Sequence, residues 1–181
     1  MTLVELLTRN AEKIQSVLPK SLSCKPIITG YGEKRDIYIQ PQYGNRCIHL
    51  GIDTPLPAGT KIVCPLNARV HSFADNQRDG DYGPTVILQH ELDQHIFYSL
   101  YGHLSRTDLP TWHEGQPFAQ GAVIGHIGAS SENGGWPPHL HLQLIDQIGQ
   151  YQGDYPGVCR PEEAEHYLNN CPNPEGLIIA S

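Results

Sequence analysis

The chain has 181 residues, of which 12 are basic and 19 acidic, so its formal net charge is -7. Because no stretch gathers lysines and arginines, the composition argues against a protein that binds nucleic-acid phosphates. With 39% hydrophobic and 17% charged residues, 18 glycines and 15 prolines, the chain is typical of one folded domain with many turns and short strands. The composition leaves the oligomeric state open.

The five cysteines are an odd number and form no Cys-x-x-Cys pair. This argues against a disulfide framework and against a thiolate zinc site. Cys47 and Cys64 lie in apolar, strand-like surroundings, and we expect them to be buried free thiols.

The first residues predict an amphipathic helix. Apolar side chains recur at helical spacing, Thr2 and Glu5 form a capping box, and Pro19 ends the run; the apolar positions are Leu3, Leu7, Ala11, Ile14 and Leu18. The apolar core is too short for a signal peptide, and no segment has transmembrane length. We therefore expect a cytoplasmic protein without a membrane span, with a periplasmic location or export by another route as the alternative.

The middle of the chain predicts an antiparallel β-sandwich or barrel-like sheet, because short apolar runs alternate with turn-rich separators. Candidate strands are Lys61–Cys64, Ala68–Phe73, Thr85–His90, His95–His103, Val123–Ile127 and His139–Ile145. A short alternating stretch covers 36–40, and a short helix is expected over 160–170. We divide the chain into an N-terminal helix and lead-in (1–45), a β domain (46–150) and a C-terminal extension (151–181).

His139 and His141 are the most informative pair. Side chains alternate along a strand, so the two imidazoles project from one face while Leu140, Leu142 and Leu144 face the other. The pair suits either two metal ligands or one ligand beside an acid–base group. A cupin-like metal protein also displays such a pair, but it usually carries a glutamate shortly afterwards, where this chain has Leu144 and Ile145.

His49 and Asp53 could join this site only if the chain bends between them. In a straight strand they would lie about 13 Å apart, too far for one metal ion. Gly51 is the residue that would permit the bend. His103 ends a candidate strand beside a glycine and could reach a cleft. The other histidines have no partners at informative spacing.

Together, His49-x-x-x-Asp53, His103 in Tyr-Gly-His-Leu-Ser, and His139-x-His141 resemble the motifs of lysostaphin/LytM-type zinc metallopeptidases, in the same order. The resemblance covers about residues 46–145 and identifies 46–150 as a metallopeptidase-like domain. It implies the duplicated hybrid motif fold, mainly antiparallel β-sheet, here with short terminal helices. Where the family often has Phe-Glu after the histidine pair, this chain has Leu142-Gln143.

The resemblance implies Zn²⁺ held by His49, Asp53 and His141, with His103 and His139 as the catalytic pair. It implies an endopeptidase that uses metal-activated water, with peptidoglycan-type cross-links or peptides containing glycine or D-amino acids as substrates. The alternative is a non-catalytic zinc-binding relative that binds peptide or regulates a partner cell-wall hydrolase.

Overall fold

The computed structural model describes residues 1–22, 26–36 and 44–179. Most of the regular structure in these residues is β-strand, and the helices are short. They are α1 (Leu3–Arg9), η1 (Ala11–Lys13), η4 (Arg106–Thr111), η5 (Pro161–Glu163), α2 (Ala164–Asn170) and α3 (Gly176–Ile179). Within the described ranges, no helix combines the length and the apolar character that crossing a bilayer would require.

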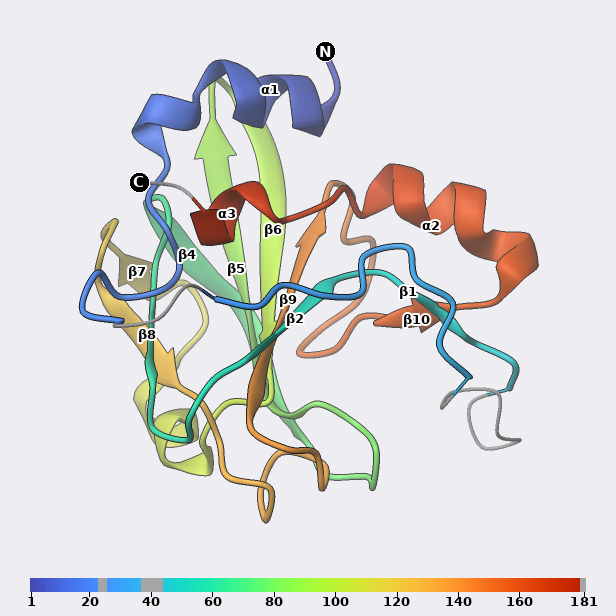
Figure 1. Cartoon of the computed structure of the whole chain (residues 1–181). Coiled ribbons are helices and arrows are strands. Elements are labelled where there is room, and N and C mark those ends of the chain that lie inside the picture. Colours follow the sequence, from blue (N-terminus) through green and yellow to red (C-terminus); the bar gives the residue numbers. More distant parts are fainter. Residues whose placement is uncertain (23–25, 37–43, 180–181) are drawn as a thin grey trace.

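The strands pair antiparallel in one six-stranded sheet and two two-stranded sheets. The large sheet has the order β2 (Ile52–Pro55), β9 (His139–Ile145), β6 (His95–Gly102), β5 (Gly83–Leu92), β4 (Ala68–Asn76) and β7 (Pro117–Phe118). The small sheets pair β1 (Ile48–His49) with β10 (Val158–Cys159), and β3 (Lys61–Val63) with β8 (Val123–His126). They lie on opposite flanks of the long strands (Figure 1). The predicted mainly-β, antiparallel fold is confirmed, as a sandwich-like arrangement rather than a closed barrel.

Both faces of the large sheet are covered. Leu140, Leu142 and Leu144 of β9 point into the larger core cluster, whereas Ile145 of the same strand belongs to a second cluster on the opposite face. The second cluster includes Tyr155 and other residues of the C-terminal extension. His139 and His141 alternate with the leucines, so they lie on the face that the extension covers. The chain after β9 therefore contributes to the surroundings of the histidine pair.

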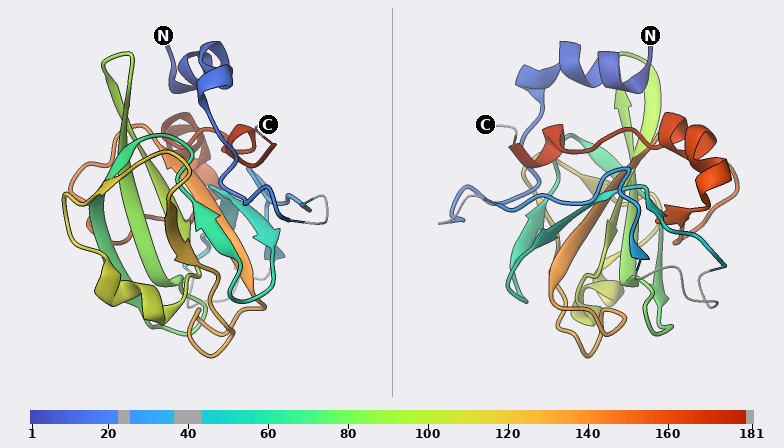
Figure 2. Two further views of the ribbon diagram at one scale, coloured as in Figure 1. Left: turned by 90° about the vertical axis from the view of Figure 1, so that its left-hand side faces the viewer. Right: turned by 45° about the vertical axis from the view of Figure 1, so that its right-hand side comes forward.

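The N-terminal helix is shorter than the apolar spacing predicts. The capping box of Thr2 and Glu5 forms, but α1 ends at Arg9. Asn10 stops the helix, since its side-chain amide donates to the carbonyl of Leu6, 3.0 Å away, and to Asp93. Beyond it, Ala11 is exposed in η1, whereas Ile14 and Leu18 lie in an irregular segment and belong to the larger core cluster. This segment runs beside the C-terminal end of the chain, since the backbone N–H of Val17 donates to the carbonyl of Leu177, and Figure 2 shows the two termini at one end of the molecule.

The strands form close to their predicted positions. β9 has the predicted bounds, while β4 and β5 extend beyond theirs. β3, β6 and β8 end one residue earlier than predicted, so His103 follows β6 instead of ending it. The predicted tail helix forms as η5 followed by α2. Cys47 and Cys64 are buried free thiols, as expected. Most of the alternating stretch predicted over 36–40 lies outside the described residues.

Candidate metal centre and active site

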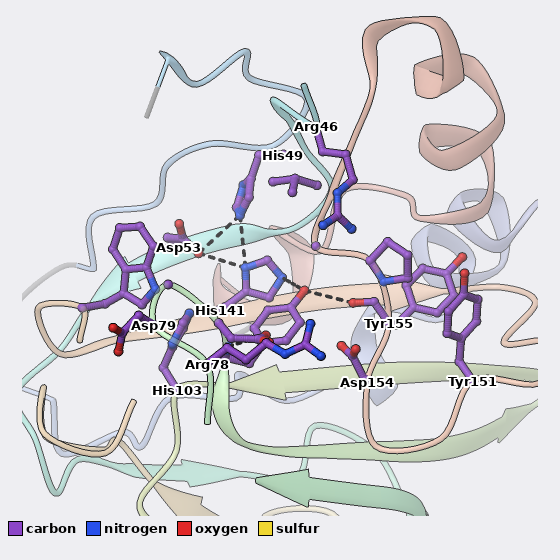
Figure 3. Close-up of a pocket in the computed structure, with 17 residues that line it drawn as sticks. Arg46, His49, Asp53, Arg78, Asp79, His103, His141, Tyr151, Asp154 and Tyr155 are labelled. Atoms are coloured by element: carbon purple, nitrogen blue, oxygen red, sulfur yellow. Dashed lines mark hydrogen bonds and ion pairs between the residues drawn. The ribbon is translucent and has the colours of Figure 1, made fainter. Parts of the chain in front are cut away.

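Three of the predicted site residues bring donor atoms together. The Nδ1 atom of His141 lies 3.1 Å from Nε2 of His49 and 3.1 Å from Oδ1 of Asp53. The third side of this triangle, from His49 Nε2 to Asp53 Oδ1, is 3.5 Å long. In the part of the chain that the structure describes, this is the one His/Cys/Asp/Glu group whose donor atoms could share a metal ion. Figure 3 shows the three side chains converging on one point.

Strand pairing and one glycine produce this convergence. Asp53 and His141 are opposite each other in the β2–β9 register, so the sheet itself sets their distance. His49 lies on β1, which pairs with a different strand, and the chain turns between β1 and β2 as expected at Gly51. A Cβ at Gly51 would lie 2.6 Å from the carbonyl oxygen of Leu142 and 2.8 Å from the ring of His141. Only glycine therefore leaves room for the His141 ring.

Hydrogen bonds on the far side of each ring fix which nitrogen faces the cluster. Nδ1 of His49 lies 2.9 Å from the carbonyl oxygen of Gly30, which can only accept, so this nitrogen carries the proton and Nε2 keeps its lone pair. Nε2 of His141 lies 3.1 Å from Oε1 of Gln143. The lone pair of His141 is therefore on Nδ1, which faces Asp53 and His49. Both rings are oriented as metal ligands require.

Gln143 is held in the orientation that this bond needs. Its side-chain nitrogen donates to the carbonyl oxygen of Pro156 at 3.1 Å and to the sulfur of Cys171 at 3.3 Å. The amide oxygen must then face His141 and accept its proton. Gln143 therefore orients the His141 ring without adding a buried negative charge.

Arg35 holds the outer oxygen of Asp53. Its Nη1 lies 2.5 Å from Oδ2 of Asp53, while Oδ1 faces the two histidines. The chain around Arg35 runs along the site, since residues 29 and 34 form bridges with Asp53 and Ile48. The carboxylate therefore presents one oxygen to the cluster and the other to a guanidinium. Burial opposes its ionisation, yet the close contacts with the rings of His141, His49 and His139 hold the pKa of Asp53 well below its ordinary value.

His103 and His139 form the second half of the site. Their ring centroids are 4.1 Å apart. Nδ1 of His103 donates to the carbonyl of Asn133 at 2.9 Å, and Nδ1 of His139 donates to the carbonyl of Pro137 at 2.7 Å. Each ring therefore keeps the Nε2 lone pair, and that of His139 lies 3.8 Å from Oδ1 of Asp53. His103 has a φ of 61°, a left-handed conformation that a non-glycine residue adopts at a cost.

Burial keeps these imidazoles neutral. It lowers the pKa of His49 to about 3. Burial and the neighbouring rings of His139 and His141 hold the pKa of His103 well below its ordinary value. Burial also lowers the pKa of His139, although the charge of Asp53 opposes the shift. These three histidines are therefore available as ligands or as proton acceptors near neutral pH.

The donor set fits zinc. With bonds of about 2.0–2.1 Å, two donors at the corners of a zinc tetrahedron lie about 3.3 Å apart. The three distances of 3.1, 3.1 and 3.5 Å match this spacing. Two neutral imidazoles and one carboxylate are donors that zinc accepts, and they leave a fourth position open, as in catalytic zinc sites.

The site lies in a groove of about 690 Å³. Its walls come from the segment before β1, the β4–β5 loop, the loop before β9 and the C-terminal extension; the lining residues include Arg46, Arg78, Asp79, Tyr82, Trp136, Tyr151, Asp154 and Tyr155. The hydroxyl of Tyr82 lies 3.4 Å from Nε2 of His141 and 3.3 Å from the carbonyl oxygen of Tyr155, and so links the ligand to the extension.

All five predicted site residues thus lie in or beside one groove, and sequence reasoning missed those that orient them. Arg35, Tyr82 and Gln143 each contact a predicted ligand. Gln143 continues the alternation of His139 and His141 on one face of β9, a signal that could have identified it. Arg35 and Tyr82 carry no such signal, because their contacts depend on chain packing across the sheet.

The model of peptidase family M23 matches residues 47–153, more than half of the chain. No curated protein sequence matches the chain significantly. A zinc-containing peptidase from Vibrio cholerae has a TM-score of 0.53 and 20% identity, over 72% of this chain and 36% of that one. A mutant catalytic domain of the prophage-encoded M23 protein EnpA from Enterococcus faecalis has a TM-score of 0.51 and 21% identity, over 81% of this chain and 95% of that one.

A protein from Pseudomonas aeruginosa described as an M23 peptidase has a TM-score of 0.47 and 21% identity, over 98% of this chain and 60% of that one. The chain therefore spans less than two thirds of the Pseudomonas and Vibrio proteins. At these identities the likeness to the Vibrio and Enterococcus structures shows a shared fold.

Proposed function

The chain belongs to peptidase family M23, and from that membership and the geometry of the groove we propose that it is a zinc-dependent endopeptidase. The family assignment confirms the resemblance predicted from the motifs and favours a peptidase over a cupin-like protein. The observation that carries the proposal is the triangle of His49, Asp53 and His141 donor atoms, spaced as zinc requires, with two further imidazoles beside it.

In this proposal His49 through Nε2, Asp53 through Oδ1 and His141 through Nδ1 hold the metal. Zinc bound there would polarise a peptide carbonyl and lower the pKa of a bound water to about 7. Gly30 and Gln143 keep the two ligand rings in the required tautomers. The three ligand side chains are therefore oriented toward the metal position before any substrate enters.

His103 and His139 supply the proton transfers. Both rings keep the lone pair on Nε2, because their Nδ1 atoms donate to backbone carbonyls. We assign the acceptance of the attacking water's proton to His139, since its Nε2 lies 3.8 Å from the ligand oxygen of Asp53. The same proton is then returned from His139 to the leaving amine, directly or by way of Nε2 of His103, whose ring centroid lies 4.1 Å from that of His139.

As the substrate class we propose peptides of the peptidoglycan type, including cross-links that contain glycine or D-amino acids. The family supports this class, and the metal cluster lies in a groove of about 690 Å³. We further propose that residues 46–150 form the metallopeptidase-like domain, flanked by the segments 1–45 and 151–181. We also propose a cytoplasmic location.

The test is metal analysis of the purified protein, followed by incubation with purified peptidoglycan and mass spectrometry of the released peptides. We expect one zinc per chain in the wild type, loss of zinc in His141→Ala, and retained zinc without activity in His103→Ala. His113→Ala is the matched control, because His113 is exposed and lies outside the groove.

A wild type that cannot be loaded with zinc would overturn the proposal. Stoichiometric zinc without cleavage would instead support the non-catalytic relative, which binds peptide or regulates a partner hydrolase.

A further inference from the structure

One loop supplies the hydrogen-bond acceptors of both proton-transfer histidines. Nδ1 of His103 donates to the backbone carbonyl of Asn133 at 2.9 Å, and Nδ1 of His139 donates to that of Pro137 at 2.7 Å. Both acceptors lie in the segment that leads into β9. The conformation of this segment therefore determines which nitrogen of each ring carries the proton.

Asn133 begins a turn that its own side chain closes. In an ordinary β-turn the backbone carbonyl of the first residue accepts the N–H of the fourth. Here Oδ1 of Asn133 accepts the backbone N–H of Trp136 instead, at 3.0 Å. Asparagine side chains commonly replace a backbone carbonyl in turns. The replacement leaves the backbone carbonyl of Asn133 available to His103.

The middle of this turn is a pair of glycines. Gly134 and Gly135 have φ values of 85° and 86°, in the left-handed region that glycine adopts without strain. The β4–β5 loop packs directly on the turn, since a Cβ at Gly134 would overlap the carbonyl oxygen of Asp81 and the N–H of Gly80 donates to the Gly134 carbonyl at 2.9 Å. Glycines have little conformational preference of their own. The bond between the two ends of the turn therefore stabilises it.

Glu132 holds the same loop from its outer side. Its carboxylate accepts a backbone N–H at each oxygen, from Ala129 at 3.1 Å and from Arg106 at 2.9 Å. Arg106 begins η4, shortly after His103 in the chain. The carboxylate thus connects the segment of His103 to the loop that carries Asn133.

The Asn133 side chain does not itself meet the substrate. It is fully buried and does not line the groove. Its Nδ2 has no hydrogen-bond partner among the residues that the structure describes. A buried donor without a partner costs stability, and an apolar side chain would avoid that cost. The acceptor oxygen is therefore the feature that asparagine adds at this position.

We propose that Asn133 is a positioning residue for both proton-transfer histidines. Its side chain closes the turn, and the turn holds the two backbone carbonyls that keep the Nδ1 protons of His103 and His139. Each ring then has its Nε2 lone pair available for proton transfer. The inference rests on the proposed function, because it concerns the two rings to which that function assigns the proton.

The tautomers of the two rings test this independently of cleavage. Nitrogen NMR spectra of isotope-labelled, zinc-loaded protein distinguish a protonated ring nitrogen from one with a lone pair, and His103→Ala and His139→Ala assign the signals. We expect both wild-type rings to be protonated on Nδ1. Asn133→Leu has a similar volume and no acceptor. It should keep zinc, show mixed tautomers in both rings, and release peptides from peptidoglycan at least about tenfold more slowly.

A conservative variant and a matched control separate positioning from general stability. Asn133→Asp retains an acceptor oxygen for the N–H of Trp136 and should restore the Nδ1 tautomers. Asn10→Leu is the control, because Asn10 is also buried and hydrogen-bonded but lies outside the groove. It should lower the temperature of thermal unfolding and leave both tautomers unchanged. If Asn133→Leu does not fold, Glu132→Ala, at a partly exposed position, should shift the tautomer of His103.

Wild-type tautomers in folded Asn133→Leu, or in Glu132→Ala if only that variant folds, would overturn the inference. The same change in Asn10→Leu, or a failure of Asn133→Asp to restore the tautomers, would also overturn it. A change in one ring alone would contradict the claim that one residue serves both. If the tautomers follow Asn133 but the wild type releases no peptide from peptidoglycan, the proposed peptidase activity is wrong and the positioning of the rings stands.

Discussion

Asp53 and His141 face each other in the register of β2 and β9, with Oδ1 and Nδ1 3.1 Å apart. Two of the three proposed zinc ligands are therefore positioned by the backbone pairing of a sheet, which is among the most rigid frameworks a protein offers. The third, His49, reaches them because the chain turns at Gly51. The metal centre should thus be largely formed before zinc binds.

Gln143→Leu should weaken zinc binding by about 10- to 100-fold, because the variant removes the acceptor that keeps the proton of His141 on Nε2. Competition with a chromogenic chelator measures the affinity. Gln147→Leu is the control, since Gln147 is exposed on the loop after β9. An unchanged zinc affinity in Gln143→Leu would show that the hydrogen bond does not orient the ligand.

Arg35→Gln should lower the rate of peptide cleavage by about tenfold, while zinc stays bound. Without the guanidinium on Oδ2, the Asp53 carboxylate can turn and offer both oxygens to the metal, which raises the coordination number. The visible spectrum of the cobalt(II)-substituted protein reports this change as weaker absorption. Arg9→Gln, which breaks an exposed pair with Asp93, should leave the spectrum unchanged. Identical spectra for Arg35→Gln and wild type would contradict the assignment.

Gly51→Ala should cost about 1–3 kcal/mol of stability, because the added methyl group would overlap the Leu142 carbonyl and the His141 ring. The displaced ring should also bind zinc at least tenfold less tightly. Urea unfolding of the zinc-free protein and chelator competition measure the two effects. Gly176→Ala is the matched control, since a Cβ there meets nothing within 4 Å. Wild-type stability and zinc affinity in Gly51→Ala would refute the close approach.

The zinc-free protein should lose stability as the pH falls from 7 to 5. Burial lowers the pKa of His90 to about 4, whereas an unfolded histidine titrates near 6.5. The unfolded state therefore binds the proton first, and stability declines below about pH 6.5, on the order of 2 kcal/mol from this residue at pH 5.

Urea unfolding at several pH values measures this dependence. His90→Gln cannot be protonated, so its stability should decline less steeply than that of the wild type. His113→Gln, at an exposed position, should keep the wild-type slope. Equal slopes for His90→Gln and wild type would show that the buried ring does not control the acid response.

The sequence predicted those features that depend on local pattern. The alternation of β9 placed His139 and His141 on one face, and the need for a bend identified Gly51. The N-terminal helix was predicted too long, because helical spacing cannot show that Asn10 bonds back to Leu6 and ends it. Arg35 and Tyr82 reach the ligands only through packing between distant segments, and the C-terminal wall of the groove depends on how the extension folds over β9. Such relationships have no local signal.

The most direct test of the proposed zinc centre is to titrate the metal-stripped protein with zinc while measuring release of peptides from purified peptidoglycan. We predict no release without zinc, a linear increase up to one equivalent per chain, and a plateau beyond it. Full activity in the stripped protein, or one tightly bound zinc with no peptide released, would contradict the proposed zinc peptidase.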